Sequence, residues 1–352
     1  MAKRAPASEN IETDRVAGFS HPRETRTMIG QDAALTRAAR AMRGGKPPQA
    51  WLLCGPPGVG KATLAYRIAR YLLAHGARDT GAEDLSVSAN DPDSLRMVAG
   101  AHPGLLVLKR GLNPDTGKLM NVLSVGEIRR LAGFFGMTSG AGGWRVAIVD
   151  TADDMNDNAA NALLKLLEEP PSRAMLLLLS NTPGRLLPTI RSRCQRLELR
   201  PLDTALVERE LARLLPDSNP GERASLARLS GGSIGAALQL ASGESAELAA
   251  EADRLIDNAR MPDAVALMAL GDRIARMTDG LEMFGDFLIQ ALTARIRART
   301  LQGGANLDCW TASLTKLGSL FARSGGLHLD PRQTLLGAGR EIAEAARRAG
   351  PL

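Results

Sequence analysis

The stretch that decides the fold of this 352-residue chain reads Cys54-Gly55-Pro56-Pro57-Gly58-Val59-Gly60-Lys61-Ala62-Thr63. It has the glycine spacing and the lysine of a phosphate-binding loop. In such a loop, successive backbone N–H groups point at phosphate oxygens, and the lysine ammonium contacts the β- and γ-phosphates. We therefore predict that this loop, with Asp150 further along the chain, forms an ATP-binding site.

One chemical group of the usual loop is missing. Ala62 stands where a serine or threonine hydroxyl normally holds Mg²⁺. Thr63 follows one residue later, and on a helix that is a rotation of about 100°. We expect weak ATP binding without efficient hydrolysis, with Mg²⁺ entering only together with the nucleotide. A glycine-rich turn that binds no nucleotide remains the alternative.

The surrounding pattern indicates an α/β fold. Four short apolar runs are typical of strands buried in a parallel sheet, at residues 51–54, 105–108, 146–149 and 175–179. Helical periodicity covers residues 62–73 and 158–169, and the second helix is stopped by Pro170-Pro171. The order strand, glycine loop, helix is the one that a phosphate-binding loop requires.

The chain is long enough for two or three domains, at roughly 150 residues each. Beyond Pro201 the pattern becomes entirely helical, with glycines at positions 231, 232 and 243. We predict four segments: a flexible N-terminal segment at 1–20, a nucleotide-binding core at 21–201, a small helical lid at 202–242 and a larger helical domain at 245–349.

Composition excludes several classes of protein. Hydrophobic residues make up 44% of the chain, but no apolar run approaches the roughly 20 residues that span a bilayer. Residues 1–20 are polar, so we expect a cytoplasmic protein without membrane contact.

The three cysteines and four histidines are scattered, which predicts no zinc site. A net charge of +6 suits an acidic partner, although a solvated, arginine-rich surface explains it equally well.

A second departure lies after the run 146–149. Asp150 matches the aspartate that holds Mg²⁺ in ATPases with this loop, but Thr151 replaces the acid that usually follows it to polarise the attacking water. We interpret Asp153 and Asp154 as helix-cap or surface groups rather than substitutes. The two gaps together predict little or no catalysis by this chain alone.

An arginine-rich segment, 189–196, follows the last apolar run. A guanidinium is always charged and binds phosphate with two hydrogen bonds, so Arg191 and Arg193 would suit a phosphate on a neighbouring subunit. Surface ion pairs are the alternative for these arginines. Cys194 has no base beside it in the sequence and is interpreted as a small buried residue.

The motifs together resemble the delta-prime subunits of the bacterial DNA polymerase III clamp loader, which belong to the AAA+ family. The resemblance is carried by the phosphate-binding loop and by three further segments that fall between residues 28 and 200, namely Asn161-Ala162-Leu163-Leu164-Lys165-Leu166-Leu167-Glu168-Glu169-Pro170-Pro171, Ser180-Asn181-Thr182-Pro183 and Ser192-Arg193-Cys194. It implies an AAA+ core, a lid and a C-terminal collar that packs into a hetero-oligomeric ring with gamma/tau and delta subunits.

The resemblance also implies a role in DNA replication, as a subunit of a DNA-directed DNA polymerase (nucleotidyltransferase) holoenzyme that loads the sliding clamp (beta) onto primed DNA. Arg193 would be an arginine finger that acts in trans on the ATP of an adjacent gamma/tau subunit, with Arg191 in support. Gly232 to Ala237 occupies the region where motor subunits carry a sensor arginine, and it contains none. We therefore expect a stator.

The competing hypothesis is an autonomous AAA+ ATPase or motor subunit that hydrolyses ATP itself. A monomeric DNA-binding protein is disfavoured because aromatic residues, at 3%, are few.

Overall fold

The chain divides into two compact units, Met1–Pro201 and Leu202–Leu352, in a computed structural model. The structure describes residues 15–16, 18–43, 45–78, 80, 84–111, 120, 122–136, 143–241, 243–277, 280–301, 307–327, 329–350 and 352. Most of the predicted flexible segment at 1–20, namely residues 1–14 and 17, lies outside these residues.

The first unit is built on a five-stranded parallel sheet in the order β2-β3-β4-β1-β5. The strands are β1 (Ala50–Cys54), β2 (Leu105–Leu108), β3 (Arg145–Val149), β4 (Ala174–Ser180) and β5 (Gln195–Glu198). The central strand β4 is buried along its whole length, and this burial on both faces is why its sequence is a continuous apolar run. The four predicted strands are confirmed.

β5 was not predicted, because its sequence does not look like a buried strand. It lies at the edge of the sheet, where only Leu197 is buried, and Arg196 and Glu198 pair across 2.7 Å on the exposed side. Its first residue, Gln195, is in register with Trp51 of β1. Charged residues on an edge strand discourage pairing with other chains.

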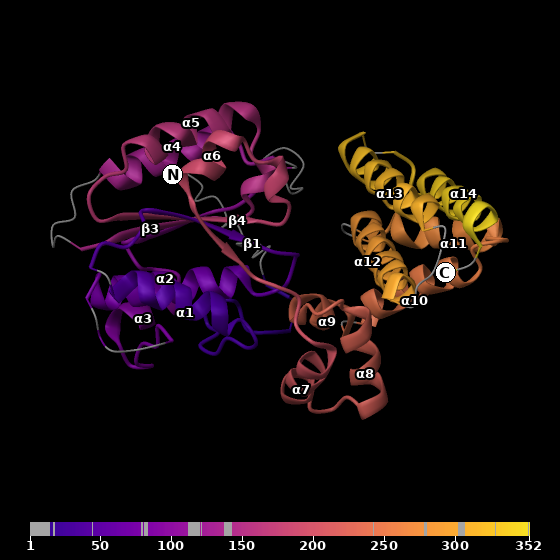
Figure 1. Ribbon diagram of the computed structural model, residues 1–352, viewed down its shortest axis with the longest axis horizontal. Helices are drawn as coiled ribbons and strands as arrows, with labels where there is room; N and C mark the ends of the chain where they lie inside the picture. The colour runs from indigo at the N-terminus through magenta and orange to yellow at the C-terminus, as the bar shows by residue number, and fades with distance from the viewer. Residues whose placement is uncertain are drawn as a thin grey trace, which may run out of the picture. The chain divides into compact units, whose positions relative to one another are not determined.

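Helices cover both faces of the sheet (Figure 1). One face is covered by α1 (Asp32–Arg43), α2 (Lys61–His75) and α3 (Pro92–Val98), and the other by α4 (Val125–Gly136), α5 (Asp157–Glu168) and α6 (Pro188–Arg193). Two single-turn 3₁₀ helices, η1 (Ala152–Asp154) and η2 (Pro183–Arg185), follow β3 and β4. Alternate residues of β1, β2, β3 and β4 enter the two apolar cores, as Leu52 and Leu53 of β1 do.

Local signals in the sequence explain where these helices begin and end. The Asn156 side chain accepts a hydrogen bond from Ala159 N–H at 2.9 Å and caps α5, which ends before Pro170-Pro171. Ser124 accepts one from Glu127 N–H at 3.3 Å at the start of α4. The buried face of α5 carries Leu163 and Leu167 at helical spacing.

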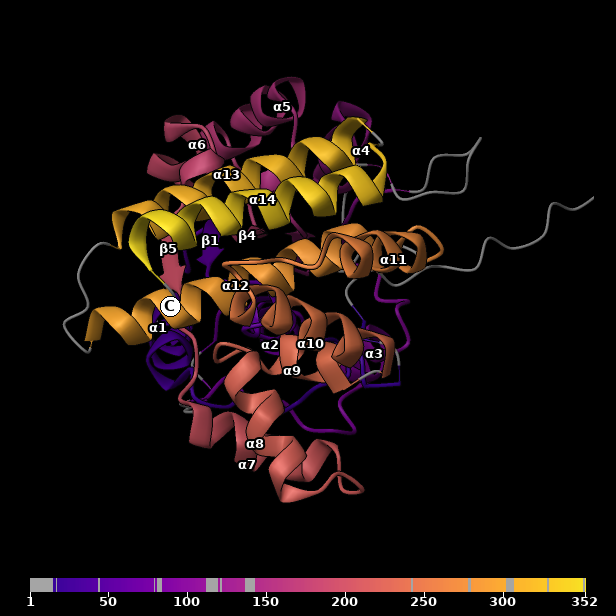
Figure 2. The same ribbon diagram turned by 90° about the vertical axis from the view of Figure 1, so that its right-hand side faces the viewer.

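The second unit consists of helices in the residues that the structure describes, as predicted. They are α7 (Thr204–Leu214), α8 (Pro220–Leu229), α9 (Ile234–Ala241), α10 (Gly243–Asp257), α11 (Ala264–Ile274), α12 (Gly280–Leu301), α13 (Asp308–Leu327) and α14 (Pro331–Ala349). Helices α7, α8 and α9 pack against one another, and α14 packs beside α11 and α13 (Figure 2). The predicted α/β core followed by an all-α region is confirmed. Its division into a lid at 202–242 and a collar at 245–349 stays a prediction.

Candidate nucleotide site and arginine finger

The loop of residues 55–60 joins the carboxyl end of β1 to the first turn of α2. Gly58 has a φ of 69° and Gly60 a φ of 104°, values that favour glycine. A Cβ at Gly55 would lie 2.6 Å from the Leu199 carbonyl oxygen, so only glycine allows this close approach. The structure thus forms a tight loop at the start of a helix, which is the geometry that binds phosphate through backbone N–H groups.

Lys61 closes this loop on itself. Its ammonium donates hydrogen bonds of 2.8 Å each to the carbonyl oxygens of Gly55 and Pro56. The side chain is only 7% exposed, and burial lowers the pKa of Lys61 to about 8, opposed by the nearby charges of Asp150 and Asp153. A phosphate entering the loop would replace the two carbonyl oxygens as the partner of the ammonium.

The loop residues fit the phosphates of a nucleotide but supply no metal hydroxyl. Ala62 lies half-buried against the apolar core that α2 forms with the sheet. Thr63 is the next residue of the same helix. Pro57 and Val59 complete the loop, and the Val59 side chain is buried. Bound ATP would therefore be held by backbone groups and Lys61, and any Mg²⁺ would lack its usual ligand from the helix.

Asp150 lies at the carboxyl end of β3, where its backbone N–H donates to Leu108 O at 2.8 Å. The Thr151 hydroxyl donates to the Asp150 carboxylate at 3.4 Å. Because β1 and β3 run parallel in one sheet, Lys61 and Asp150 both follow the carboxyl ends of its strands. The Asp150 charge there acts to raise the pKa of Lys61. No cluster of three or more metal-ligating side chains occurs among the described residues.

The interpretation of Asp153 as a cap or surface group is wrong. Its carboxylate accepts hydrogen bonds from the Ser180 hydroxyl at 2.7 Å, from Asn181 N–H at 2.5 Å and from Thr182 N–H at 3.1 Å. It therefore ties the segment after β3 to the end of β4, two strands that are neighbours in the sheet. Asp154 pairs with Arg110 at 3.2 Å, and burial raises its pKa.

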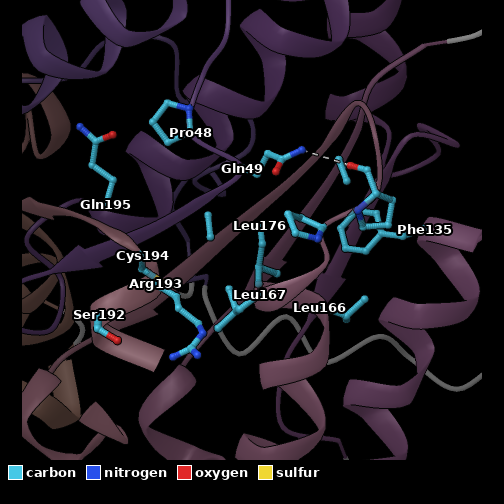
Figure 3. Close-up of a pocket in the computed structure, with 14 residues that line it drawn as sticks. Pro48, Gln49, Phe135, Leu166, Leu167, Leu176, Ser192, Arg193, Cys194 and Gln195 are labelled. Carbon is cyan, nitrogen blue, oxygen red and sulfur yellow. Dashed lines mark hydrogen bonds between the residues drawn. The ribbon is translucent and has the colours of Figure 1, made fainter. Parts of the chain in front are cut away.

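Arg193 lies near the amino-terminal ends of the strands, whereas the phosphate-binding loop lies at their carboxyl ends. It is the last residue of α6, just before β5, and its guanidinium donates to Glu168 Oε1 at 2.9 Å and to Thr189 O at 3.1 Å. Residues at the starts of β1, β4 and β5 line a pocket of about 400 Å³ here, and Figure 3 shows Arg193 beside Leu167 on its wall. Arg191 is exposed on the same short helix.

Cys194 packs into the apolar core beneath α6 and is 9% exposed. Burial raises the pKa of its thiol to about 12, and the nearby Cys54 adds to this. A thiol with so high a pKa is not a nucleophile at neutral pH, which agrees with its interpretation as a packing residue.

The region without a sensor arginine starts α9. Gly231 and Gly232 adopt φ values of 58° and 86°, and the Ser233 hydroxyl accepts a hydrogen bond from Ala236 N–H at 3.1 Å at the start of the helix. These residues form a glycine turn and a helix cap.

Two contacts were missed by sequence reasoning. The Gln31 side chain is buried and bonds to the backbone of Val59 and Arg200, and no motif in the sequence indicates this role. Glu168 was part of a motif without a role of its own, and it is the ion-pair partner of Arg193. The Gln31 and Arg200 contact joins residues 169 positions apart, so no local pattern indicates it.

Comparison with known proteins agrees with this geometry. A family model described as "DNA polymerase III, delta subunit" matches residues 30–203. DNA polymerase III subunit delta' of Pseudomonas aeruginosa is 41% identical over 185 residues, which cover 52% of this chain and 53% of that protein. The delta' subunit of Escherichia coli is 36% identical over 203 residues, 57% of this chain and 56% of that protein.

Over residues 30–203 the first unit is similar to DNA polymerase III delta-prime subunits. The resemblance carried by the motifs is thereby confirmed. The chain spans about half the length of the delta-prime relatives it matches. A match to the tau subunit of Escherichia coli is longer but weaker, at 25% identity over 318 residues, which cover 88% of this chain and 45% of that protein. No helix in the described parts of the delta-prime-like chain has the length and apolar character to cross a bilayer.

Proposed function

We propose that this chain is a stator subunit of a DNA polymerase III clamp loader, which donates Arg193 to the ATP site of an adjacent gamma/tau subunit. The similarity of the first unit to delta-prime subunits supports the assembly, and the match to the tau subunit supports the kind of neighbour. The other expected partners are a delta subunit and, through the complex, the sliding clamp and primed DNA in the cytoplasm.

The observation that carries the proposal is the separation of Arg193 from the chain's own phosphate-binding loop. The loop follows Cys54 at the carboxyl end of β1, whereas Arg193 precedes Gln195, which pairs with Trp51 near the start of β1. Trp51 and Gly55 are four residues apart, which along a strand is a distance of about 13 Å. Arg193 therefore cannot contact phosphates bound at Lys61 of the same chain and is available only to a neighbour.

The environment of Arg193 suits transfer to a phosphate. Its side chain is 37% exposed, and that of its partner Glu168 is 52% exposed. An ion pair at this exposure contributes about 1 kcal/mol or less, because water screens it. A phosphate with several negative charges would be a stronger partner for the guanidinium. An arginine that reaches a phosphate in trans can raise turnover by about 10³ to 10⁵.

The chain's own loop is proposed to bind nucleotide without efficient turnover. Lys61 and the glycines supply phosphate contacts, while Ala62 and Thr151 leave out the metal hydroxyl and the acid that polarises water. The helical segment 245–349 is proposed as the collar that assembles with the other subunits.

The test is ATP turnover by the reconstituted complex with gamma/tau and delta, in the presence of primed DNA. Arg193→Ala should leave assembly intact and lower DNA-stimulated turnover at least tenfold. Arg130→Ala is a matched control, because Arg130 is also a surface arginine in an ion pair, with Glu127. Unchanged turnover with Arg193→Ala in an assembled complex would reject the finger.

The alternative of an autonomous ATPase is tested with the chain alone. Lys61 and Asp150 are both present at one edge of the sheet, which keeps this alternative open. Turnover by the isolated chain that Lys61→Ala abolishes would identify a motor. No turnover alone, with stimulated turnover in the complex, supports the stator.

A further inference from the structure

We propose that Gln31 couples the phosphate-binding loop to the chain that leads into the second unit. In this role Gln31 is a positioning residue. When phosphate binding rearranges the loop, the buried Gln31 amide transmits the displacement to Arg200, and Arg200 transmits it to the start of the helical unit. The proposal rests on the nucleotide-binding part of the proposed function and is independent of Arg193.

The first observation is the set of bonds that the Gln31 amide makes. Its Nε2 donates to Arg200 O at 2.7 Å, and its Oε1 accepts from Arg200 N–H at 3.2 Å. This is the pair of bonds that a neighbouring strand would make. The last backbone bond between β1 and the β5 segment is Leu199 N–H to Cys54 O, after which β1 turns away into the loop. At Arg200, the Gln31 side chain makes the two hydrogen bonds that β1 would have made if it had continued.

The second observation is that the same amide nitrogen lies 3.5 Å from Val59 O, in the phosphate-binding loop. A primary amide offers two N–H donors and one acceptor, and the three backbone groups around Gln31 require two donors and one acceptor. The side chain is 6% exposed, so water does not readily substitute for it. A carboxylate here would face two carbonyl oxygens, and an apolar side chain would leave all three groups without this partner.

The loop also meets the same segment through its backbone. Gly55 approaches Leu199 so closely that a Cβ would lie 2.6 Å from the Leu199 carbonyl oxygen and 3.0 Å from Val59 Cγ1. Phosphate binding must draw Lys61 away from the Gly55 and Pro56 carbonyls that it now contacts. A rearrangement of this closely packed loop therefore bears on Leu199 directly and on Arg200 through Gln31.

Only one residue, Pro201, lies between this contact at Arg200 and the first backbone bond of the helical unit at Leu202. Pro201 follows Arg200, and Leu202 N–H donates to Gly232 O at 2.8 Å, at the glycine turn before α9. Pro201 restricts its own backbone and that of Arg200. A displacement at Arg200 therefore acts on the backbone that leads to Leu202.

The experiment is backbone amide hydrogen exchange on the full chain, with and without ADP and Mg²⁺, in wild type, Gln31→Leu and Gln31→Glu. In the free wild-type chain the Arg200 amide should exchange roughly tenfold more slowly than in Gln31→Leu, which removes its acceptor. Gln31→Glu keeps an acceptor for this N–H but loses the two donors to the carbonyl oxygens of Arg200 and Val59, so it breaks the link to the loop. ADP should change exchange at Arg200 and Leu202 in wild type only. Gln49→Leu is the matched control, since Gln49 is bonded to Pro171 O at the opposite edge of the sheet.

The outcomes separate the coupling from nucleotide binding. If ADP protects loop amides in wild type but leaves Arg200 and Leu202 unchanged, or if Gln31→Glu responds as wild type does, the coupling is wrong and nucleotide binding stands. If ADP protects nothing in wild type, nucleotide binding and the coupling are both wrong, whereas the finger is unaffected. Should Gln31→Leu fail to fold, Gln31→Glu and the wild-type response still decide the result.

Discussion

The Arg193 guanidinium lies 2.9 Å from the Glu168 carboxylate, near the amino-terminal ends of the strands and away from the phosphate-binding loop. Both residues are exposed enough for another molecule to reach them. The ion pair therefore holds the arginine in place without burying it, and a neighbouring phosphate would have to compete with Glu168. This competition can be measured.

Glu168→Gln removes the competing charge and retains an oxygen that accepts hydrogen bonds. We expect the assembled complex to hydrolyse ATP faster, by at most about fivefold, because an exposed ion pair contributes no more than about 1 kcal/mol. Glu169→Gln is the neighbouring control and should have no effect. A fall in turnover with Glu168→Gln would mean that Glu168 orients the arginine productively.

Arg193→Lys keeps the positive charge but loses the planar, two-pronged donor. If Arg193 contacts the phosphate with two hydrogen bonds, lysine should recover little of the activity, and DNA-stimulated turnover should stay about tenfold or more below wild type. Steady-state ATPase assays of the complex measure this. Full activity with lysine would indicate that only the charge matters.

Ala62→Thr restores the hydroxyl that the loop lacks. We expect Mg²⁺ to strengthen ADP binding about tenfold more in this variant than in wild type, as measured by calorimetric titration with and without Mg²⁺. Turnover should remain slow, because Thr151 still replaces the second acid. Thr63→Ala should leave the effect of Mg²⁺ as it is in wild type; a loss there would show that Thr63 is already the metal ligand.

Nucleotide affinity should depend on pH through Lys61. Burial lowers the pKa of this lysine from 10.5 to about 8, so the free chain loses the proton as the pH rises through about 8. Phosphate favours the protonated form, so ADP should bind best below pH 8 and up to about tenfold more weakly for each pH unit above it. In Lys61→Arg the charge persists and the dependence should vanish. Equal wild-type affinity at pH 7 and pH 9.5 would contradict the prediction.

Asp153→Ala should destabilise the first unit. The substitution leaves the Ser180 hydroxyl and two backbone N–H groups without their acceptor, which costs about 2–3 kcal/mol in free energy of unfolding. Chemical denaturation followed by circular dichroism measures it. Asp157→Asn, at the exposed first turn of α5, should cost less than about 1 kcal/mol. Similar losses in the two variants would show that the Asp153 bonds contribute little.

Much of the fold could be predicted because its signals are local. β4 is apolar at nearly every position because helices cover both of its faces. Neighbouring residues also set the ends of α5, which is capped by Asn156 and stops before Pro170. β5 was missed for the opposite reason. As an edge strand it keeps one residue buried and exposes charged ones, so its sequence resembles a loop.

The sequence by itself determined the phosphate-binding loop, the missing hydroxyl at Ala62 and the helical character beyond Pro201, because each depends on residues a few positions apart. Only the tertiary structure decided that Asp153 binds the end of β4, that Gln31 bonds to Arg200, and that Arg193 and Lys61 lie at opposite edges of the sheet. These relationships depend on strand order and register, which bring together some side chains that are distant in the chain and keep others apart.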